Sequence, residues 1–309
     1  MKAVAEITLA VLVMCLLFCG CKGYRETDSE YFVSSVCFEK TNGEFTVDIE
    51  VLSLKSEEDK SESKVFSAAG KTVYEAADNT VSLMPKNAVF DHCGTAVIGS
   101  ALEGEDLKSV MEYLYNTKNL NLGIRMFVSE DIKSVLYCES QAMSIGYDIL
   151  AVESNINKIS GVDFKNKYYE VVSRHMSRGG FCLPKVENIN GRPGISGEYL
   201  YVDFSPAAAL DFEESIFYNI AYSGSSGGEI SVGGKRCRVD KITSKINRRG
   251  DTLEIDIKCR YRHKNDKQNS GIKHAVKGVF SKYGSADMLV PVFGDRCEDI
   301  SGVEVSVHE

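Results

Sequence analysis

The sequence predicts an α+β protein of two to three mixed domains, in which largely antiparallel sheets are flanked by helices. Apolar and polar residues alternate in Phe45–Leu54 and again in Leu253–Tyr261, which is typical of strands in a sheet with one buried face. Residues 107–114 instead carry apolar side chains at helical spacing. A chain of 309 residues, 43% of them hydrophobic, is long enough to build two or three such domains.

The chain starts with an apolar run, residues 7–20, that predicts a signal peptide over residues 1–20. The run is shorter than the roughly 20 residues that a membrane span needs, and polar residues follow it directly. Its end, Gly20 followed by Cys21, resembles a bacterial lipobox. That resemblance implies that Cys21 receives diacylglycerol and becomes the N-terminus. An ordinary cleaved signal peptide and an uncleaved anchor helix are the alternatives.

The first elements after this segment form a predicted β-hairpin. Phe32–Phe38 and Phe45–Leu54 have the pattern of strands, and Asn42-Gly43 between them is a strong signal for a tight turn. In the second strand the apolar side chains face one way, and polar side chains, Glu50 among them, face the other. We therefore expect a half-buried strand with Glu50 on the polar face.

Helices and strands alternate through the rest of the first part, and only residues 140–160 fit neither pattern clearly. The predicted elements are, in order, a charged loop (Lys55–Lys64), a helix (Thr72–Leu83), a strand (Gly94–Ile98), a helix (residues 107–114), a strand (Ile124–Val128), a short helix capped by Ser129 and ending at Leu136, and a helix capped by Asp163, with apolar Tyr169, Val172 and Met176 and with Gly179-Gly180 at its end.

Turn-forming residues at Asn190-Gly191 and Pro193-Gly194 mark a change in the chain. We place a domain boundary there, which divides the chain after the signal peptide into residues 21–190 and residues 191–309. The second part is also mixed α and β. Its predicted elements are a strand (Tyr199–Asp203), a helix (Asp211–Ala221), a strand (Leu253–Tyr261), a helix (Ile272–Lys282) and a last strand with Val303, Val305 and Val307.

Charge and cysteine content exclude several kinds of site. The formal net charge of −8 argues against nucleic-acid binding, which needs a basic face. If Cys15 and Cys19 leave with the signal peptide and Cys21 carries lipid, the seven other cysteines are odd in number and widely spaced. That is no disulfide framework, and we expect several of them to pack as small hydrophobic residues. The sequence has no C-x-x-C and no metal-ligand spacing, so we expect no metal and no cofactor.

Three segments resemble catalytic or phosphate-binding motifs, but each lacks a feature that its motif requires. Gly70–Thr72 lacks the glycine that a phosphate-binding loop needs at position 65, where Val65 stands. Ser226 lies in a G-x-S-x-G match, but a strand pattern follows it instead of the helix of a nucleophile elbow. His92 and Cys93 are adjacent, and adjacent residues on a strand point to opposite faces. We therefore expect no catalytic residue, and binding or assembly is favoured over catalysis.

The segment Ala69–Leu102 is similar to the C-subunit lipoproteins of spore germinant receptors. That family has a G-K-T/S helix start with an aromatic residue and E-A, a helix ending near a proline, and then F-x-H before an apolar strand. Arg25-Glu26, Phe181–Pro184 and Ile195–Gly197 also match, whereas Lys22 replaces the usual tryptophan and the C-terminal region is shorter than usual. The matching residues are Gly70, Lys71, Thr72, Tyr74, Glu75, Ala76, Pro85, Phe90, His92, Ile98 and Gly99.

The resemblance implies a non-enzymatic subunit of a spore germinant receptor that acts in germination. It implies that Cys21 anchors the chain by lipid to the outer face of the spore's inner membrane, where the chain works with two integral-membrane subunits. It identifies neither the germinant nor whether this subunit contacts it. A lipid-anchored solute-binding protein and an anchored hydrolase using Ser226 or Cys93 are the competing hypotheses.

Overall fold

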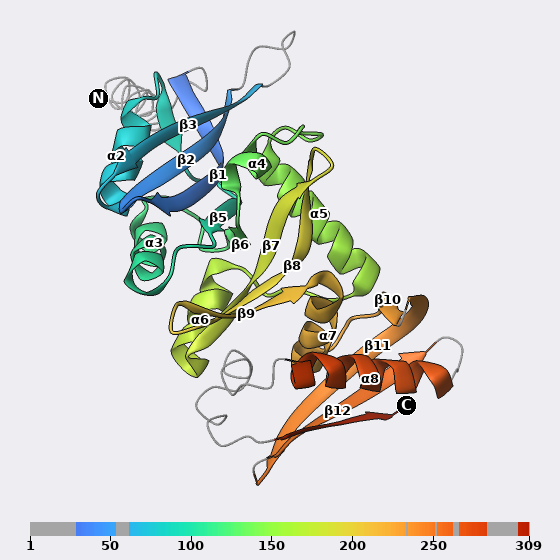
Figure 1. Cartoon of the computed structure of the whole chain (residues 1–309). Helices are drawn as coiled ribbons and strands as arrows, with labels where there is room; N and C mark the ends of the chain where they lie inside the picture. The colour runs from blue at the N-terminus through green and yellow to red at the C-terminus, as the bar shows by residue number, and fades with distance from the viewer. Residues whose placement is uncertain are drawn as a thin grey trace, which may run out of the picture.

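The computed structural model describes residues 29–53, 62–232, 234–250, 252–261, 266–282 and 302–308. These residues form a nine-stranded sheet and a four-stranded sheet with helices packed against them (Figure 1). The predicted α+β class is therefore confirmed. None of the helices in the described ranges is long and apolar enough to cross a membrane.

The nine-stranded sheet is antiparallel at both ends and parallel in its middle. Its strand order is β3-β2-β1-β5-β6-β7-β8-β9, and β4 pairs with β1. The parallel pairs β1–β5 and β5–β6 are joined through helices, as parallel strands require. The strands are β1 (Glu30–Thr41), β2 (Glu44–Ser53), β3 (Glu62–Gly70), β4 (Asn87–Val89), β5 (Thr95–Gly99), β6 (Arg125–Ser129), β7 (Gly180–Ile189), β8 (Arg192–Val202) and β9 (Ser205–Asp211).

The first hairpin forms as the sequence predicts. Asn42 and Gly43 have φ angles of 54° and 84°, the left-handed conformations that a tight hairpin turn needs. The charged loop predicted at Lys55–Lys64 is only partly tested, because residues 54–61 lie outside the described residues. Its end is not a loop, since Glu62–Gly70 pairs with β2 as a third antiparallel strand.

The prediction that β2 is half-buried is wrong. Asp48 and Glu50 alternate with the apolar residues of β2, yet they are only 4% and 1% exposed. The reason is that both faces of this part of the sheet are covered. Helix α2 (Val73–Ser82) packs on one face, and the N-terminal end of α5 (Ile145–Ser160) meets the other, where its first backbone N–H groups reach Glu50.

Helices connect the strands of the first sheet along the chain, and the N-cap residues predicted for two of these helices are wrong. Asp131, not Ser129, caps α4, and its carboxylate accepts a hydrogen bond from the backbone N–H of Ser134. Lys167 occupies the N-cap of α6, whereas Asp163 lies before it and pairs with Lys165. The remaining helices here are α3 (Gly104–Asn116), α4 (Ile132–Leu136) and α6 (Tyr168–Arg178).

Helix α6 buries a different face from the one that its apolar residues suggested. Tyr169 and Met176 are 49% and 81% exposed, whereas Tyr168 and Val171 are buried. The hydroxyl of Tyr168 donates a hydrogen bond to the backbone carbonyl of Met111, which allows a polar aromatic residue to serve as the buried anchor. The buried face is thus shifted by one residue toward the start of the helix.

The second sheet has the order β10-β11-β12-β13 and is antiparallel except for the pair β12–β13. Helices α7 and α8 pack against it, and α7 also contacts β8 of the first sheet. The predicted domain boundary at residues 190 and 191 coincides with the turn between β7 and β8, which are neighbours in one sheet. The elements are α7 (Phe212–Ser223), β10 (Gly228–Val232), β11 (Lys235–Arg249), β12 (Thr252–Tyr261), α8 (Asp266–Lys282) and β13 (Gly302–His308).

The hydrophobic interior consists of two clusters. One lies between α2, α3, α6 and the first sheet. The other runs from the opposite face of that sheet through α5 and α7 to the second sheet, and it includes Phe127, Ile149, Phe217 and Ile255. This second cluster is therefore a core that both sheets share, and α5 and α7 are the elements that join the sheets (Figure 1).

Candidate functional site

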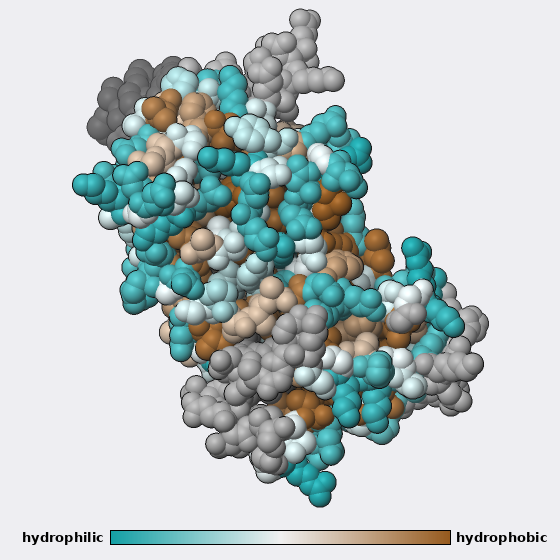
Figure 2. All heavy atoms as spheres, in the orientation of Figure 1, coloured by the Kyte–Doolittle hydropathy of each residue, from teal (hydrophilic) through white to brown (hydrophobic). Residues whose placement is uncertain are grey.

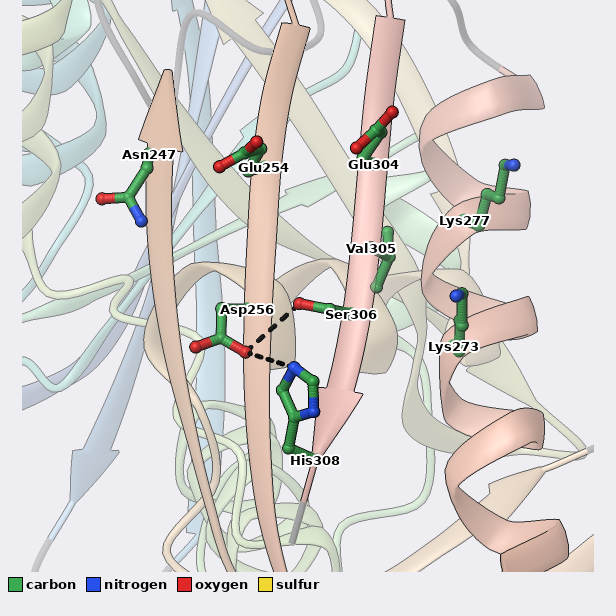
Figure 3. A pocket seen from close by; sticks show the side chains of 9 residues that line it. All are labelled: Asn247, Glu254, Asp256, Lys273, Lys277, Glu304, Val305, Ser306 and His308. Carbon is green, nitrogen blue, oxygen red and sulfur yellow. Dashed lines mark hydrogen bonds and ion pairs between the residues drawn. The ribbon is translucent and has the colours of Figure 1, made fainter. Parts of the chain in front are cut away.

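A polar groove of about 630 Å³ lies on the second sheet (Figure 3). In β12, Leu253, Ile255 and Ile257 are buried, so the intervening Glu254 and Asp256 point to the opposite face. In the parallel register of β12 and β13, some neighbouring side chains carry the same charge and others differ in chemistry. The lining residues are Asn247 from β11, Glu254 and Asp256 from β12, Glu304, Val305, Ser306 and His308 from β13, and Lys273 and Lys277 from α8.

Asp256 is at the centre of the interactions in this groove. Its carboxylate accepts a hydrogen bond from the hydroxyl of Ser306 at 3.2 Å, and it lies 3.3 Å from Nε2 of His308 (Figure 3). The side chain of His308 is 59% exposed and that of Asp256 is 32% exposed. The serine hydroxyl is thus bonded to a carboxylate and not to a histidine base, which is not the arrangement of an activated nucleophile.

The charges around the groove suit a polar ligand better than a metal. Carboxylates on β12 and β13 line this hollow together with Lys273 and Lys277 of the neighbouring helix, so both signs of charge are present around it. Among the residues that the structure describes, no group of three His, Cys, Asp or Glu side chains is placed to hold a metal ion. The groove has the size of a small-molecule site.

The segment around Lys71 is used for helix capping. The hydroxyl of Thr72 accepts a hydrogen bond from the backbone N–H of Glu75, and the carboxylate of Glu75 accepts one from the N–H of Lys71. A side chain on Gly70 would lie 2.4 Å from the backbone nitrogen of Ala76, so the helix start packs directly on the glycine. These amide groups are engaged by the capping interaction and do not form a phosphate cradle.

The residues of the hydrolase hypothesis lie apart and are held by structural contacts. Ser226 donates a hydrogen bond to the backbone carbonyl of Gly161, which ties its loop to the end of α5. Cys93 is 2% exposed, and burial raises the pKa of its thiol to about 12, so the reactive thiolate is strongly disfavoured. His92, its neighbour in sequence, is exposed and packs beside the ring of Phe32.

The cysteines in the described part of the chain behave as small hydrophobic residues. All are buried and none forms a disulfide there. Burial raises the pKa of the Cys37 thiol well above its ordinary value, in the same direction as for Cys93. Cys21, the predicted acylation site, and Cys297 lie outside the described residues. The buried cysteines are Cys37, Cys93, Cys138, Cys182, Cys237 and Cys259.

The three carboxyl groups that are most deeply buried in the described residues were not predicted from the sequence. Glu50 in β2, Glu153 in α5 and Glu198 in β8 are each at most 1% exposed. Burial raises the pKa of Glu153 to about 7, although its carboxylate lies 2.7 Å from the guanidinium of Arg125. Burial also raises the pKa of Glu198 to about 8. For Glu50 and Glu198, an acidic residue between apolar neighbours in a strand was the available signal, but alternation alone assigns such a residue to solvent.

A second hollow lies between the two sheets and is apolar. It has a volume of about 330 Å³ and is formed by the last turns of α5, the first turns of α7 and the strand β10. Ile159 of α5 and Phe212 of α7 line it and remain 61% and 40% exposed. Figure 2 shows hydrophobic residues gathered along α5 down to this junction. Among the described residues, a polar hollow thus lies on the second sheet and an apolar hollow lies where the two sheets meet.

Comparison with known proteins gives one family match and one solved structure. Residues 23–188 match the family model described as the spore germination protein N-terminal domain. The crystal structure of the GerBC protein aligns with a TM-score of 0.45 at 13% sequence identity, covering 88% of this chain and 96% of that chain. No curated protein matches the chain.

Proposed function

Because this chain belongs to the spore germination protein family, whose N-terminal domain spans residues 23–188, we propose that it is the lipid-anchored, non-catalytic subunit of a spore germinant receptor. In this proposal Cys21 carries the lipid and holds the chain at the outer face of the spore's inner membrane. The chain then assembles there with two integral-membrane subunits of the receptor.

The single observation that carries the proposal is where the family match begins. It starts two residues after Cys21, directly behind the apolar run and its lipobox-like end. Each buried CH₂ of an acyl chain contributes about 0.8 kcal/mol to membrane binding, so two or three chains hold a protein firmly. A tethered subunit also meets its membrane partners at a high effective concentration.

The surroundings of Cys93 and Ser226 support a non-catalytic role. The thiol of Cys93 is kept protonated by burial, and Ser226 serves to fasten a loop. The polar groove around Asp256 favours a second candidate function, that of a lipid-anchored solute-binding protein, because mixed charges in a hollow of about 630 Å³ suit a small polar ligand. That candidate predicts saturable binding of a small molecule by the isolated chain.

The proposal is tested by affinity purification of the tagged chain from detergent-solubilised spore membranes, with mass spectrometry of everything that elutes. We expect a diacylated N-terminal peptide that starts at Cys21, together with two multi-span membrane proteins. Cys21→Ala should release the chain from the membrane fraction, whereas Cys19→Ala, in the segment that is removed, should not. Recovery of a lone, unacylated chain that begins elsewhere contradicts the proposal.

A further inference from the structure

The apolar hollow between the sheets, which we call the junction cavity, is bounded on one side by a strand edge. Ile156 and Ile159 come from α5, and Phe212 and Ile216 come from α7. The third wall is β10, an edge strand of the four-stranded sheet. Among the described residues, no strand pairs with β10 on the side away from β11.

Three consecutive residues of β10 show that its edge faces the cavity. Glu229, Ile230 and Ser231 all line the hollow. Successive side chains of a strand point to opposite faces of the sheet, so a hollow in contact with all three runs along the backbone of the strand. Ile230 itself is 2% exposed and belongs to the core. The edge of β10 therefore presents main-chain N–H and C=O groups to the cavity, next to apolar side chains.

The rim of the junction cavity is acidic. Glu213 stands in the first turn of α7, and Glu229 stands on β10. Arg236 reaches Glu229 only at 3.8 Å and its side chain is 88% exposed, so it offsets this charge weakly. An apolar floor, an open strand edge and a negative rim together select an extended polypeptide with apolar side chains and an adjacent positive charge.

We propose that the junction cavity binds an extended segment of a partner polypeptide, which pairs with the edge of β10, places apolar side chains against Ile159 and Phe212, and sets a Lys or Arg beside Glu213 and Glu229. Strand addition of this kind takes its affinity from main-chain hydrogen bonds and its specificity from the pockets beside the edge. The inference rests on the proposed function in one respect, because it requires a partner in the receptor complex.

A second copy of this chain is a poor occupant of the cavity. A twofold interface places the same surface of each copy against the other. Such an interface would bring Glu213 and Glu229 of one copy close to the same residues of the second, and like charges at an interface oppose association. Charge complementarity therefore favours a different polypeptide with basic residues.

Photo-crosslinking from position 159 tests the proposal in the full-length chain within spore membranes. A benzoylphenylalanine replaces Ile159, and a matched control places it at Met176, an apolar residue of α6 that is 81% exposed. We expect position 159, and not position 176, to crosslink to one polypeptide. The crosslinked peptide, mapped by mass spectrometry, should contain apolar residues next to a Lys or Arg.

Reversal of the rim charges separates this docking mode from a general apolar contact. Glu213→Lys with Glu229→Lys should reduce the yield of the crosslink about tenfold, because like charges then meet at the rim. A synthetic copy of the mapped peptide should slow amide hydrogen exchange at residues 229–231, and its variant with a central proline should not. An exposed apolar contact without strand pairing would leave those amide groups unprotected.

Several outcomes overturn the proposal. A crosslink from position 159 to a second copy of the chain replaces it with a dimer interface. No crosslink, or equal crosslinking from positions 159 and 176, removes the junction cavity as a docking site. If Cys21 is nevertheless acylated and the two membrane proteins co-purify, the proposed function stands and only the docking surface is wrong. Loss of both results contradicts the proposed function as well.

Discussion

Two glutamates of the nine-stranded sheet, Glu50 in β2 and Glu198 in β8, are equally buried, but the polar groups that surround them are very different. Glu50 is 1% exposed and Glu198 is 0% exposed. Each lies where a helix meets the sheet, α5 at Glu50 and α7 at Glu198. The difference between them lies in the number of hydrogen-bond donors that reach the carboxyl group.

Glu50 is surrounded by donors from three separate segments, β1, β3 and the start of α5. Both of its oxygens accept hydrogen bonds, two of them from the first backbone N–H groups of α5, which have no partner within the helix. This arrangement fastens the start of α5 to the first sheet. The donors are the hydroxyls of Ser34 (2.9 Å), Ser35 (2.9 Å) and Ser63 (2.7 Å) and the N–H groups of Ile145 (2.8 Å) and Gly146 (3.0 Å).

Glu198 has a single strong donor. The side-chain amide of Asn219 in α7 donates to Oε2 at 2.7 Å, and within the described structure Oε1 has no hydrogen-bond partner. Burial is the main cause that raises the pKa of Glu198 to about 8, and Asn219 and Arg174 counteract it only in part. Burial alone therefore does not decide the role of a carboxyl group, because the number of hydrogen-bond donors that reach it matters as well.

The largest effect is expected from removing the Glu50 side chain. Glu50→Ala leaves buried serine hydroxyls and two helix N–H groups without an acceptor, and each such group costs about 1–3 kcal/mol. Because some of them find other partners, we expect the free energy of unfolding to fall by about 3–5 kcal/mol. Equilibrium urea unfolding followed by far-UV circular dichroism measures it, since the chain has no tryptophan.

Glu44→Ala is the matched control for this measurement. Glu44 lies at the start of the same strand and is exposed, so its loss should change the free energy of unfolding by no more than about 0.5 kcal/mol. If Glu50→Ala costs as little as Glu44→Ala, the donors around Glu50 do not stabilise the junction between α5 and the sheet.

A smaller, pH-dependent effect is expected from Glu198. Its pKa is about 8 in the folded chain and near 4.5 ordinarily. Between these values the folded chain keeps a proton that the unfolded chain releases, so the free energy of unfolding falls as pH rises, by up to about 1.4 kcal/mol per pH unit. Above pH 8 both states are ionised and this contribution stays constant.

Glu198→Gln should remove this dependence between pH 7 and pH 8. Glu153 also has a raised pKa, but at about 7 its own contribution is largely complete below that window. We therefore expect the wild-type chain to lose about 1 kcal/mol more than the variant over this interval. Urea unfolding at both pH values gives the comparison. Parallel curves for the two chains would falsify the assignment of the raised pKa to Glu198.

The sequence predicted most of the secondary structure, because hydrophobic periodicity and turn residues are local signals. Asn42-Gly43 marked the first hairpin, and the repeat in residues 107–114 marked α3. The capping residues Thr72 and Asp211 stand where helices α2 and α7 begin. These features depend on neighbours in the chain and not on the rest of the fold.

Features that depend on distant contacts could not be predicted. Glu50 was assigned to an exposed face because nothing in its strand reveals that α5, almost a hundred residues later, covers it. Strand β3 was missed because most of its residues are small or polar, and pairing with β2 decides their conformation. The polar groove around Asp256 needs the parallel register of β12 and β13, and the junction cavity needs elements from both sheets.

The smallest effect is expected from an ion pair at the surface of the same sheet. Lys40 of β1 contacts Asp106 of α3 at 2.6 Å, with side-chain exposures of 27% and 37%. Water replaces either partner when the other is removed, so Asp106→Asn should lower the free energy of unfolding by less than about 1 kcal/mol. The same urea titration measures it, and 0.5 M salt should reduce the difference further. A loss as large as that of Glu50→Ala would mean that the short distance between the two charged groups determines how strongly these contacts hold the sheet. The burial of a carboxylate with many hydrogen-bond donors would then not be the deciding factor.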